Sequence, residues 1–380
     1  MTKRKVLIYR NELLPSSETF ILSQVNTLKN FKPVFAGLKR VSDSLDIGKH
    51  PVVVAASSGA WKEKARNRLF LRAGLASRFI FEIEASKPEL VHAHFAVDAC
   101  AALPIVRKLR VPFIVTLHGY DVMQHDTAMQ RWPATRAYLR RREKLWQEAS
   151  LFLCVSEHIR KHALLRGFPE KKLRVHHIGV NVHMVSPSNK PLNEKIVLFV
   201  GRLVEKKGCI HLIRAMSRVE ESFAESRLVI VGDGPLLPDL KRAATSLKRC
   251  IFLGRQSHAQ VYEWMRRSSL LVAPSIRASN GDGEGLPTVV CEAQAIGLPV
   301  VAFATDGVIE AFPGERCALL PKAGDELALA EEMIRILKDD RVWKHISLTG
   351  RRSMEKNFDL EHQTRILECL YDEVIERHNG

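Results

Sequence analysis

Short apolar runs rich in β-branched residues recur along the chain, and amphipathic stretches separate them. Because these runs are apolar throughout rather than alternating, they are typical of central strands in parallel sheets covered on both faces. In the first half, strands are expected at 6–9, 33–37, 51–55, 90–95, 113–118 and 151–156. In the second half, they are expected at 195–201, 227–234, 250–255, 270–275, 298–303 and 317–321.

This alternation of strands and helices occurs twice, which predicts two doubly wound α/β domains of the Rossmann-like type. The polar, proline-containing segment 186–195 is the expected linker. After about residue 325 the chain looks purely helical. We therefore expect domains at 1–187 and 188–355 and a last helix at 356–380. A ligand cleft is expected at the carboxyl ends of both sheets.

Composition narrows the class of protein. The chain has 380 residues, of which 46% are hydrophobic and 26% charged, as in soluble globular proteins. Its seven cysteines are scattered and odd in number, which indicates neither a disulfide framework nor a zinc site and favours a reducing cytoplasm. The first apolar run is too short for a signal peptide, and no membrane span is expected.

The charge is distributed unevenly between the two halves. Residues 1–190 contain 32 Lys and Arg against 15 Asp and Glu, a balance of +17, whereas residues 191–380 contain 26 and 27. The first half is therefore expected to meet an anionic partner: nucleic acid, a phosphorylated glycan or an anionic membrane. Segment 61–81 interleaves six basic residues with apolar ones, and 135–146 is a second basic run. Each is either a membrane-surface helix or an ordinary helix with a solvated basic face.

Polar residues follow several of the expected strands. Arg202 and Lys207 bracket a loop that begins at Gly201 and leads into a helix. A guanidinium, an ammonium and free helix N–H groups together suit a diphosphate without a metal ion. The alternative is two exposed basic loop residues. A further glycine turn, VGDGP at 231–235, lacks the third glycine of a dinucleotide fingerprint and is interpreted as structural.

A glycine-rich loop, NGDGEG, follows the strand expected at 270–275 and contains Glu284. The next segment, 288–297, is expected to be a helix that ends at Gly297 and carries Glu292 about two turns along. Glu284 can accept hydrogen bonds from sugar hydroxyls. Glu292 lies in an otherwise apolar run and needs a partner, either a ribose diol or, in the structural alternative, an arginine.

Three histidines of the first half lie within or at the end of expected strands. His118 precedes Gly119, and a structural role is the more common one for such a histidine. His92 and His94 are two residues apart, on the same face of one strand, and are interpreted as structural because no third metal ligand can be placed. No D-x-D pair is present to hold a divalent ion on a diphosphate, so no metal site is expected.

Taken together, these residues resemble the retaining glycosyltransferases of family 4, which have the GT-B fold. The resemblance rests on an ordered set of motifs: VHAHFA, VTLHGYD, CVSEHIRKHALLRGFPEKKLRVHHIGVN, FVGRLVEKKG, VGDGP, FLGR, APS, EGLPTVVCEAQAIGLPVVA and DGVIE. The E-x7-E motif in an EGLP context is specific. The segments SETFI and NGDGEG look similar to the branch that builds bacterial exopolysaccharides and other surface glycans.

The resemblance implies a metal-independent transfer of sugar from a UDP- or GDP-sugar to a saccharide acceptor, lipid-linked or anionic, held by the first domain. Arg202 and Lys207 would hold the diphosphate, Glu284 the transferred sugar and Glu292 the ribose, with His118 beside the reacting centre. Further donor contacts implied in the same way come from Gly234, Arg255, Gly285, Leu286 and Pro287. No cofactor is expected beyond the nucleotide-sugar itself, and the last helix would cross back to the first domain.

Two departures from the family pattern matter. RNELLPSSETF replaces the Gly-Gly loop that approaches the donor phosphates in many relatives, and Asn181 replaces the aspartate of Gly-Val-Asp.

Three other classes of protein share some of these sequence features. A nucleic-acid-binding protein would explain the basic half but has no binding motif here, and a nicotinamide-dependent dehydrogenase would need the glycine fingerprint. Another GT-B enzyme, a phosphorylase or a sugar-phosphate epimerase, is the nearer alternative.

Overall fold

The structure is a computed structural model that describes residues 3–55, 77–183, 195–312 and 320–380. The chain forms two compact units, unit 1 from Met1–Gly179 and Leu360–Gly380 and unit 2 from Val180–Asp359. The expected boundaries were 187/188 and 355/356. Most of the expected linker, of the basic segment 61–81 and of the strand expected at 317–321 lies outside the described residues, and residues 320–321 form no strand.

Unit 1 is built on a seven-stranded sheet in the order β5-β3-β1-β6-β7-β8-β9, with every neighbouring pair parallel. Its strands are β1 (Arg4–Tyr9), β3 (Phe31–Gly37), β5 (Val52–Val54), β6 (Leu90–His94), β7 (Phe113–Leu117), β8 (Leu151–Cys154) and β9 (Leu173–Val175). The strand order reverses between β1 and β6. Ligands of doubly wound sheets bind at the carboxyl ends of the strands beside such a reversal.

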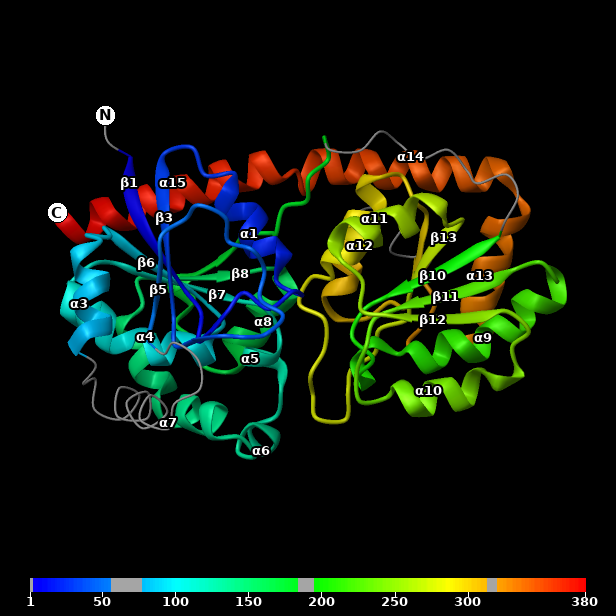
Figure 1. Cartoon of the computed structure of the whole chain (residues 1–380), viewed down its shortest axis with the longest axis horizontal. Coiled ribbons are helices and arrows are strands. Elements are labelled where there is room, and N and C mark those ends of the chain that lie inside the picture. Colours follow the sequence, from blue (N-terminus) through cyan, green and yellow to red (C-terminus); the bar gives the residue numbers. More distant parts are fainter. Residues whose placement is uncertain (1–2, 56–76, 184–194, 313–319) are drawn as a thin grey trace. The chain divides into compact units, whose positions relative to one another are not determined.

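Helices cover both faces of this sheet. Figure 1 shows α1 and α15 on one side and α4 and α7 on the other. The helices are α1 (Thr19–Asn26), α3 (Ser77–Ala85), α4 (Ala96–Leu109), α5 (Tyr120–Met123), α6 (Asp126–Met129), α7 (Pro133–Glu148), α8 (Glu157–Leu165) and α15 (Leu360–Asn379), with a 3-10 turn η1 (Glu170–Lys172). Because both faces are covered, the central strands are buried throughout, as their uninterrupted apolar sequences predict.

Helix α15 completes unit 1 although it follows unit 2 in the sequence. The ring of Tyr371 packs edge-on against Phe31 at 5.1 Å between centroids. The Glu368 carboxylate accepts the backbone N–H groups of Lys29 at 2.9 Å and Asn30 at 2.6 Å. Leu367 and its apolar neighbours on α15 join the buried core of this sheet face.

Unit 2 contains a five-stranded parallel sheet in the order β12-β11-β10-β13-β14, which reverses between β10 and β13. The strands are β10 (Ile196–Val200), β11 (Arg227–Val231), β12 (Cys250–Gly254), β13 (Leu270–Ala273) and β14 (Val300–Ala302). The helices are α9 (Cys209–Ser222), α10 (Leu237–Ala243), α11 (His258–Arg267), α12 (Thr288–Ala295), α13 (Glu326–Lys338) and α14 (Asp340–Asn357). Three 3-10 segments are η2 (Glu205–Lys207), η3 (Ala244–Ser246) and η4 (Asp306–Ala311).

The glycines of VGDGP have the structural role expected of them. Gly232 has φ +140°, and a Cβ there would lie 1.9 Å from the carbonyl oxygen of Gly201. A Cβ at Gly234 would lie 2.5 Å from the carbonyl oxygen of Leu203. The turns after β10 and β11 can therefore touch backbone to backbone only because side chains are absent.

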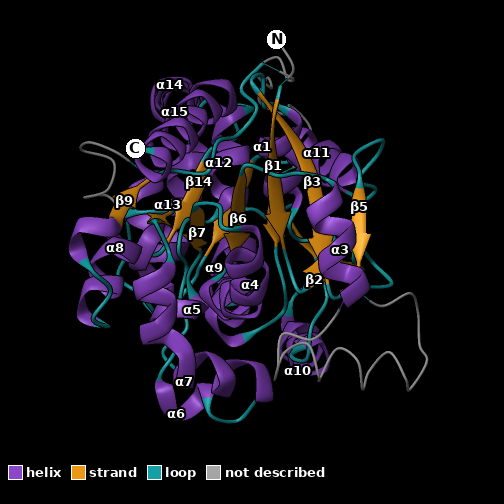
Figure 2. Ribbon diagram, turned by 90° about the vertical axis from the view of Figure 1, so that its left-hand side faces the viewer, coloured by secondary structure: helices purple, strands orange, loops and turns teal. Residues whose placement is uncertain are grey.

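The expected doubly wound α/β architecture is confirmed, and Figure 2 shows strands such as β1, β3 and β6 among the helices. The strands expected within the described residues all form. Three short strands were not anticipated: β2 (Glu12–Leu13), β4 (Lys39–Arg40) and β9. They have two or three residues and contain charged side chains, so they carry no apolar run.

Candidate active site

In unit 2, two loops meet at the strand-order reversal. The first follows β10 and runs through η2, and the second follows β13 and contains the glycine-rich segment. Three consecutive residues of η2 bind the second loop. Glu205 accepts the N–H and hydroxyl of Ser279, both at 2.8 Å. Lys206 Nζ lies 3.2 Å from Asp282 Oδ1, and Lys207 Nζ lies 2.9 Å from Glu284 Oε1.

Glu284 is buried, with only 8% of its side chain exposed. Burial acts to raise its pKa, but the charges of Lys207 and Lys206 outweigh burial and hold the pKa below its ordinary value. The contact with Lys207 is an ion pair rather than an aligned hydrogen bond, so Oε1 has no hydrogen-bond donor among the described residues. A buried, ionised carboxylate with unused acceptor capacity suits the hydroxyls of a sugar.

Arg202 is exposed, and its guanidinium makes no hydrogen bond or ion pair with the described part of the chain. The stem of Lys207 passes beside Gly201, because a Cβ there would lie 3.5 Å from Lys207 Cδ. Both expected cations therefore belong to the turn that follows β10. Arg202 is available to a ligand, whereas Lys207 is engaged by Glu284.

Gly285 and Leu286 form a second group of donors. Both are buried, and neither backbone N–H has an acceptor in the described ranges. Gly307 N–H donates to the carbonyl of Glu284 at 3.0 Å, and a Cβ at Gly307 would lie 1.7 Å from the carbonyl oxygen of Gly285. Pro287 is the N-cap of α12 and makes no side-chain cap, so the first N–H groups of that helix are also open to an anion.

Glu292 has a protein partner that was not anticipated. Its Oε1 lies 3.2 Å from His258 Nε2, at the start of α11, and no arginine among the described residues forms an ion pair with it. The hydrogen bond with Glu292 raises the pKa of His258 above its ordinary value. Because α12 begins at Thr288, Glu292 lies in its second turn, not two turns along as expected. Whether a ribose binds there stays a prediction.

Gly234 and Arg255, the remaining expected donor contacts, are connected through Asp233. Asp233 Oδ1 accepts the N–H of Gly234 at 2.7 Å, and its Oδ2 lies 3.8 Å from Arg255 Nε. Unit 2 thus places its expected residues in the turns after β10, β11, β12 and β13. These turns follow the carboxyl ends of adjacent strands.

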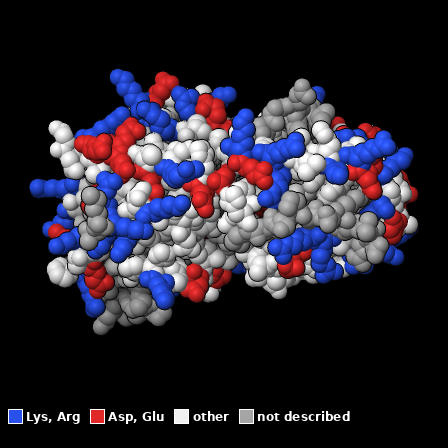
Figure 3. Space-filling model, turned by 90° about the horizontal axis from the view of Figure 1, so that it is seen from above, with Lys and Arg blue, Asp and Glu red and all other residues white. Residues whose placement is uncertain are grey.

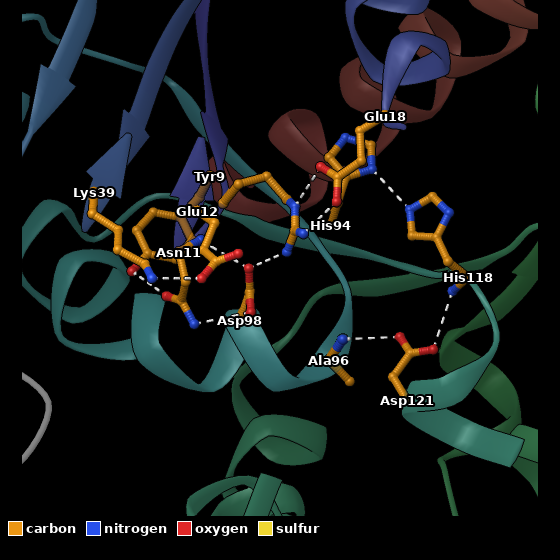
Figure 4. A network of polar contacts seen from close by, with 11 residues as sticks. Tyr9, Asn11, Glu12, Glu18, Lys39, His94, Ala96, Asp98, His118 and Asp121 are labelled. Carbon is orange, nitrogen blue, oxygen red and sulfur yellow. Dashed lines mark hydrogen bonds and ion pairs between the residues drawn. The ribbon is translucent and has the colours of Figure 1, made fainter. Parts of the chain in front are cut away.

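In unit 1, the segment that replaces the Gly-Gly loop forms a buried ionic cluster (Figure 4). Arg10 binds Glu18 through Nε at 2.9 Å and through Nη2, and its Nη1 binds Asp98. Its guanidinium also lies over the ring of Phe95 at 4.3 Å. Asp98 further accepts both the backbone N–H and the side-chain amide of Asn11. Since these contacts occupy the Arg10 side chain, Arg10 is not available to phosphate.

His118 lies next to this cluster. Its Nε2 is 3.0 Å from His94 Nδ1, and its ring packs against Phe95 at 4.4 Å and Phe20 at 5.1 Å between centroids. Asp121 accepts the backbone N–H groups of His118 and Gly119 and so fixes the turn after β7. Burial, followed by the Arg10 charge, lowers the pKa of His118 well below its ordinary value.

Several residues of this arrangement were not singled out from the sequence, namely Lys206, Asp282, His258 and the Arg10–Glu18–Asp98 cluster. His94 was interpreted as structural. Among residues 3–55, 77–183, 195–312 and 320–380, no group of three or more His, Cys, Asp or Glu side chains could hold a metal ion. In the same ranges, no helix combines the length and apolar content that crossing a membrane requires.

Comparison with known families decides the class. Residues 184–354 match the family model of "Glycosyl transferases group 1", and residues 40–183 match that of "Glycosyltransferase Family 4". The chain is a family 4 glycosyltransferase. Membership in this family favours the transferase over the nucleic-acid-binding and dehydrogenase alternatives.

Relatives of this glycosyltransferase include proteins of bacterial polysaccharide synthesis. It is 29% identical over 301 residues to TuaC of Bacillus subtilis (strain 168), whose name assigns it provisionally to teichuronic acid biosynthesis; the match covers 76% of this chain and 71% of TuaC. It is 26% identical to the amylovoran biosynthesis glycosyltransferase AmsK of Erwinia amylovora, with 76% and 69% covered. Anabaena HepE, solved with UDP and glucose, superimposes with a TM-score of 0.76 at 17% identity, over 97% of this chain and 100% of HepE. This similarity confirms the GT-B fold.

Proposed function

We propose that this glycosyltransferase moves a sugar from a UDP- or GDP-sugar to a saccharide acceptor in surface polysaccharide synthesis, with retention of configuration and without a metal ion. The named roles of TuaC and AmsK support the pathway class. The UDP and glucose bound to HepE support a nucleotide-sugar donor. Retention of the anomeric configuration is proposed from the resemblance to family 4.

The inference of donor binding rests on one observation, the set of groups that lies where the strand order reverses between β10 and β13. Arg202 is unengaged, Lys207 faces the buried carboxylate of Glu284, and the N–H groups of Gly285 and Leu286 lack acceptors. Cations and N–H donors would bind the diphosphate, and the carboxylate would accept hydroxyl groups of the sugar.

The same groups account for catalysis in the proposal. As the bond from sugar to diphosphate breaks, negative charge grows on the leaving phosphate. Arg202, Lys207 and the N-terminus of α12 would offset this charge, which is the role a divalent ion plays in other transferases. Glu284 would hold the sugar in place while the acceptor hydroxyl attacks.

A thermal-shift panel with UDP, GDP, ADP and their common sugar conjugates, each with and without EDTA, tests this proposal. We expect one nucleotide to raise the melting temperature, with no effect of EDTA. The shift should disappear in Arg202→Ala and persist in Arg218→Ala, because Arg218 is likewise an exposed arginine but lies on α9. Loss of the shift on adding EDTA would overturn metal independence. The absence of any nucleotide response would overturn donor binding.

In the proposed function, unit 1 binds the acceptor, and helix α7 brings unit 1 to the anionic membrane surface where that acceptor lies. Helix α7 carries exposed Arg136, Arg140 and Lys144 four residues apart and hence on one face. Trp132, four residues earlier, is 69% exposed. A basic stripe that ends in tryptophan is a common way to contact anionic lipid. On the face shown in Figure 3, by contrast, basic and acidic side chains are intermixed.

Vesicle sedimentation tests the membrane assignment. The protein is expected to pellet with vesicles containing phosphatidylglycerol and to stay in solution with phosphatidylcholine alone. Replacing Arg136, Arg140 and Lys144 with Gln should release it, whereas the same change at the exposed Lys241, Arg242 and Lys248 of unit 2 should not. Equal binding by both triple variants would contradict the role of α7.

A further inference from the structure

Two histidines are hydrogen-bonded at the carboxyl ends of adjacent strands. His94 is the last residue of β6, and His118 follows β7 directly. His94 Nδ1 lies 3.0 Å from His118 Nε2, and the rings are nearly parallel, at 29°. Figure 4 shows the second ring nitrogen of His118 pointing away from His94. The free nitrogen of His118 is therefore Nδ1.

The surroundings of both rings favour the neutral imidazole. Burial lowers the pKa of each well below the ordinary value, and the Arg10 charge acts in the same direction on both. A neutral imidazole has one N–H and one bare nitrogen. In the contact between them, one ring must therefore donate and the other accept, which leaves two possible arrangements.

The other nitrogen of His94 distinguishes these arrangements. His94 Nε2 is buried and has no partner among the described residues. If His94 accepted from His118, its proton would lie on Nε2 as a buried, unsatisfied N–H beside the Arg10 cation. If His94 donates from Nδ1, Nε2 is a bare lone pair, which a nearby cation favours. Unsatisfied buried N–H groups are also rarer than unsatisfied acceptors.

We propose that His94 is a positioning residue that donates its Nδ1–H to His118 Nε2 and thereby holds the His118 proton on Nδ1. His118 then presents a fixed N–H donor on the side away from the network. Phe20 and Phe95 hold the plane of the ring, and Asp121 holds its backbone. This role of His118 rests on the proposed function. With its proton fixed on Nδ1, His118 donates a hydrogen bond to a sugar oxygen and does not act as a base.

The tautomer can be measured directly without a substrate. In protein labelled with 15N-histidine, the protonated ring nitrogen is recognised by its bonded hydrogen and its distinct 15N shift, and the His118 signals are assigned by their loss in His118→Gln. A proton on Nδ1 of His118 in the unliganded protein supports the proposal. A proton on Nε2 overturns it.

A matched pair of variants then tests the role of His94. Asn and Leu have nearly the same size, but only Asn places an amide N–H where Nδ1 lies. His94→Asn should keep the His118 proton on Nδ1, whereas His94→Leu should let it shift toward Nε2. With the donor identified by thermal shift, kcat of the Leu variant should fall about 10- to 100-fold below that of the Asn variant, with little change in KM for the donor.

The kcat comparison and the tautomer measurement can each overturn the proposal. Equal kcat in the two variants, at equal melting temperature, would mean that His94 only fills space, and the proposal would fail. If one variant does not fold, the wild-type tautomer still decides. Failure of the proposed function looks different: His118 would carry its proton on Nδ1, but no nucleotide-sugar would be used.

Discussion

Lys207 Nζ lies 2.9 Å from Glu284 Oε1, so the side chains assigned to the diphosphate and to the sugar neutralise each other when no donor is bound. Burial acts to raise the pKa of Glu284, but the charge of Lys207 lowers it and so favours the ionised carboxylate. In the proposed function, a donor would bring phosphate to Lys207 and hydroxyls to Glu284 and so replace this contact with two others.

Glu284→Gln should abolish transfer but leave nucleotide binding intact. The amide keeps the shape of the carboxylate but loses its charge, so the sugar is held less well while Lys207 becomes free for the diphosphate. We expect kcat to fall by about 100-fold or more, with the affinity for the nucleotide alone unchanged or higher. Initial rates and calorimetry measure the two effects. Glu263→Gln on α11, an exposed glutamate paired with Arg266, is the control. Near-normal turnover by Glu284→Gln would contradict the role of Glu284 in holding the sugar.

The bond between Lys206 and Asp282 predicts a change in donor affinity. Asp282→Asn removes the charge that pairs with Lys206 and leaves Lys206 its hydrogen bond to the carbonyl oxygen of Gly283, at 3.3 Å, in the glycine-rich loop. The KM for the donor should rise about 5-fold, corresponding to about 1 kcal/mol, with a smaller change in kcat. Steady-state kinetics separate the two constants. Lys206→Met should raise KM similarly, and a normal KM in both variants would show that the contact is dispensable.

His258 predicts a pH-dependent stability. Its pKa lies above the ordinary 6.5 because of the bond to Glu292. The folded state therefore binds the proton more tightly than the unfolded chain does. The stabilisation is complete below pH 6.5 and is lost as the pH rises through the raised pKa. The difference in melting temperature between wild type and His258→Gln should be largest in mildly acidic buffer and smallest in alkaline buffer.

The control for this measurement is His345→Gln, because His345 is an exposed histidine on α14. Its melting temperature should follow that of wild type across the pH range. If Glu292 also binds the ribose, nucleotide affinity should increase with pH, because the nucleotide competes with protonated His258. A pH-independent difference for His258→Gln would contradict the ion pair.

Glu368→Ala should destabilise unit 1 by about 1–3 kcal/mol, since it leaves the backbone N–H groups of Lys29 and Asn30 without their acceptor. Glu361 is a suitable control on the same helix. It is exposed and pairs with Lys29 only at the surface, at 3.5 Å, so Glu361→Ala should cost well under 1 kcal/mol. Urea unfolding followed by circular dichroism measures both variants. If Glu368→Ala costs as little stability as Glu361→Ala, the hydrogen bonds of Glu368 to the backbone contribute little.

The strands could be predicted because they are central strands of parallel sheets, whose buried positions leave long apolar runs such as VLFV and LVIV. The short strands β2 and β4 lacked this signal: β4 consists of two exposed basic residues. Chemistry at strand ends could be anticipated for Arg202, Lys207 and Glu284, because charged residues beside glycines follow apolar strands there.

Pairings between side chains far apart in the sequence could not be predicted. Lys207 and Glu284 were both identified, but their contact depends on two loops meeting at a strand reversal. His258 is 34 positions from Glu292 and begins a different helix, so nothing local connects them. His94 was assigned a structural role because no third metal ligand could be placed beside His92 and His94, and its contact with His118 depends on the pairing of β6 with β7.

Unit 1 is made from both ends of the chain, and this has a consequence for its synthesis. When residue 179 leaves the ribosome, the nascent unit still lacks α15 and the apolar residues with which α15 covers the sheet. Unit 2 can close as soon as it has emerged, but unit 1 must wait until α15 has been made. A frameshift in the segment that encodes α15 would thus damage unit 1, whose sheet is encoded far upstream.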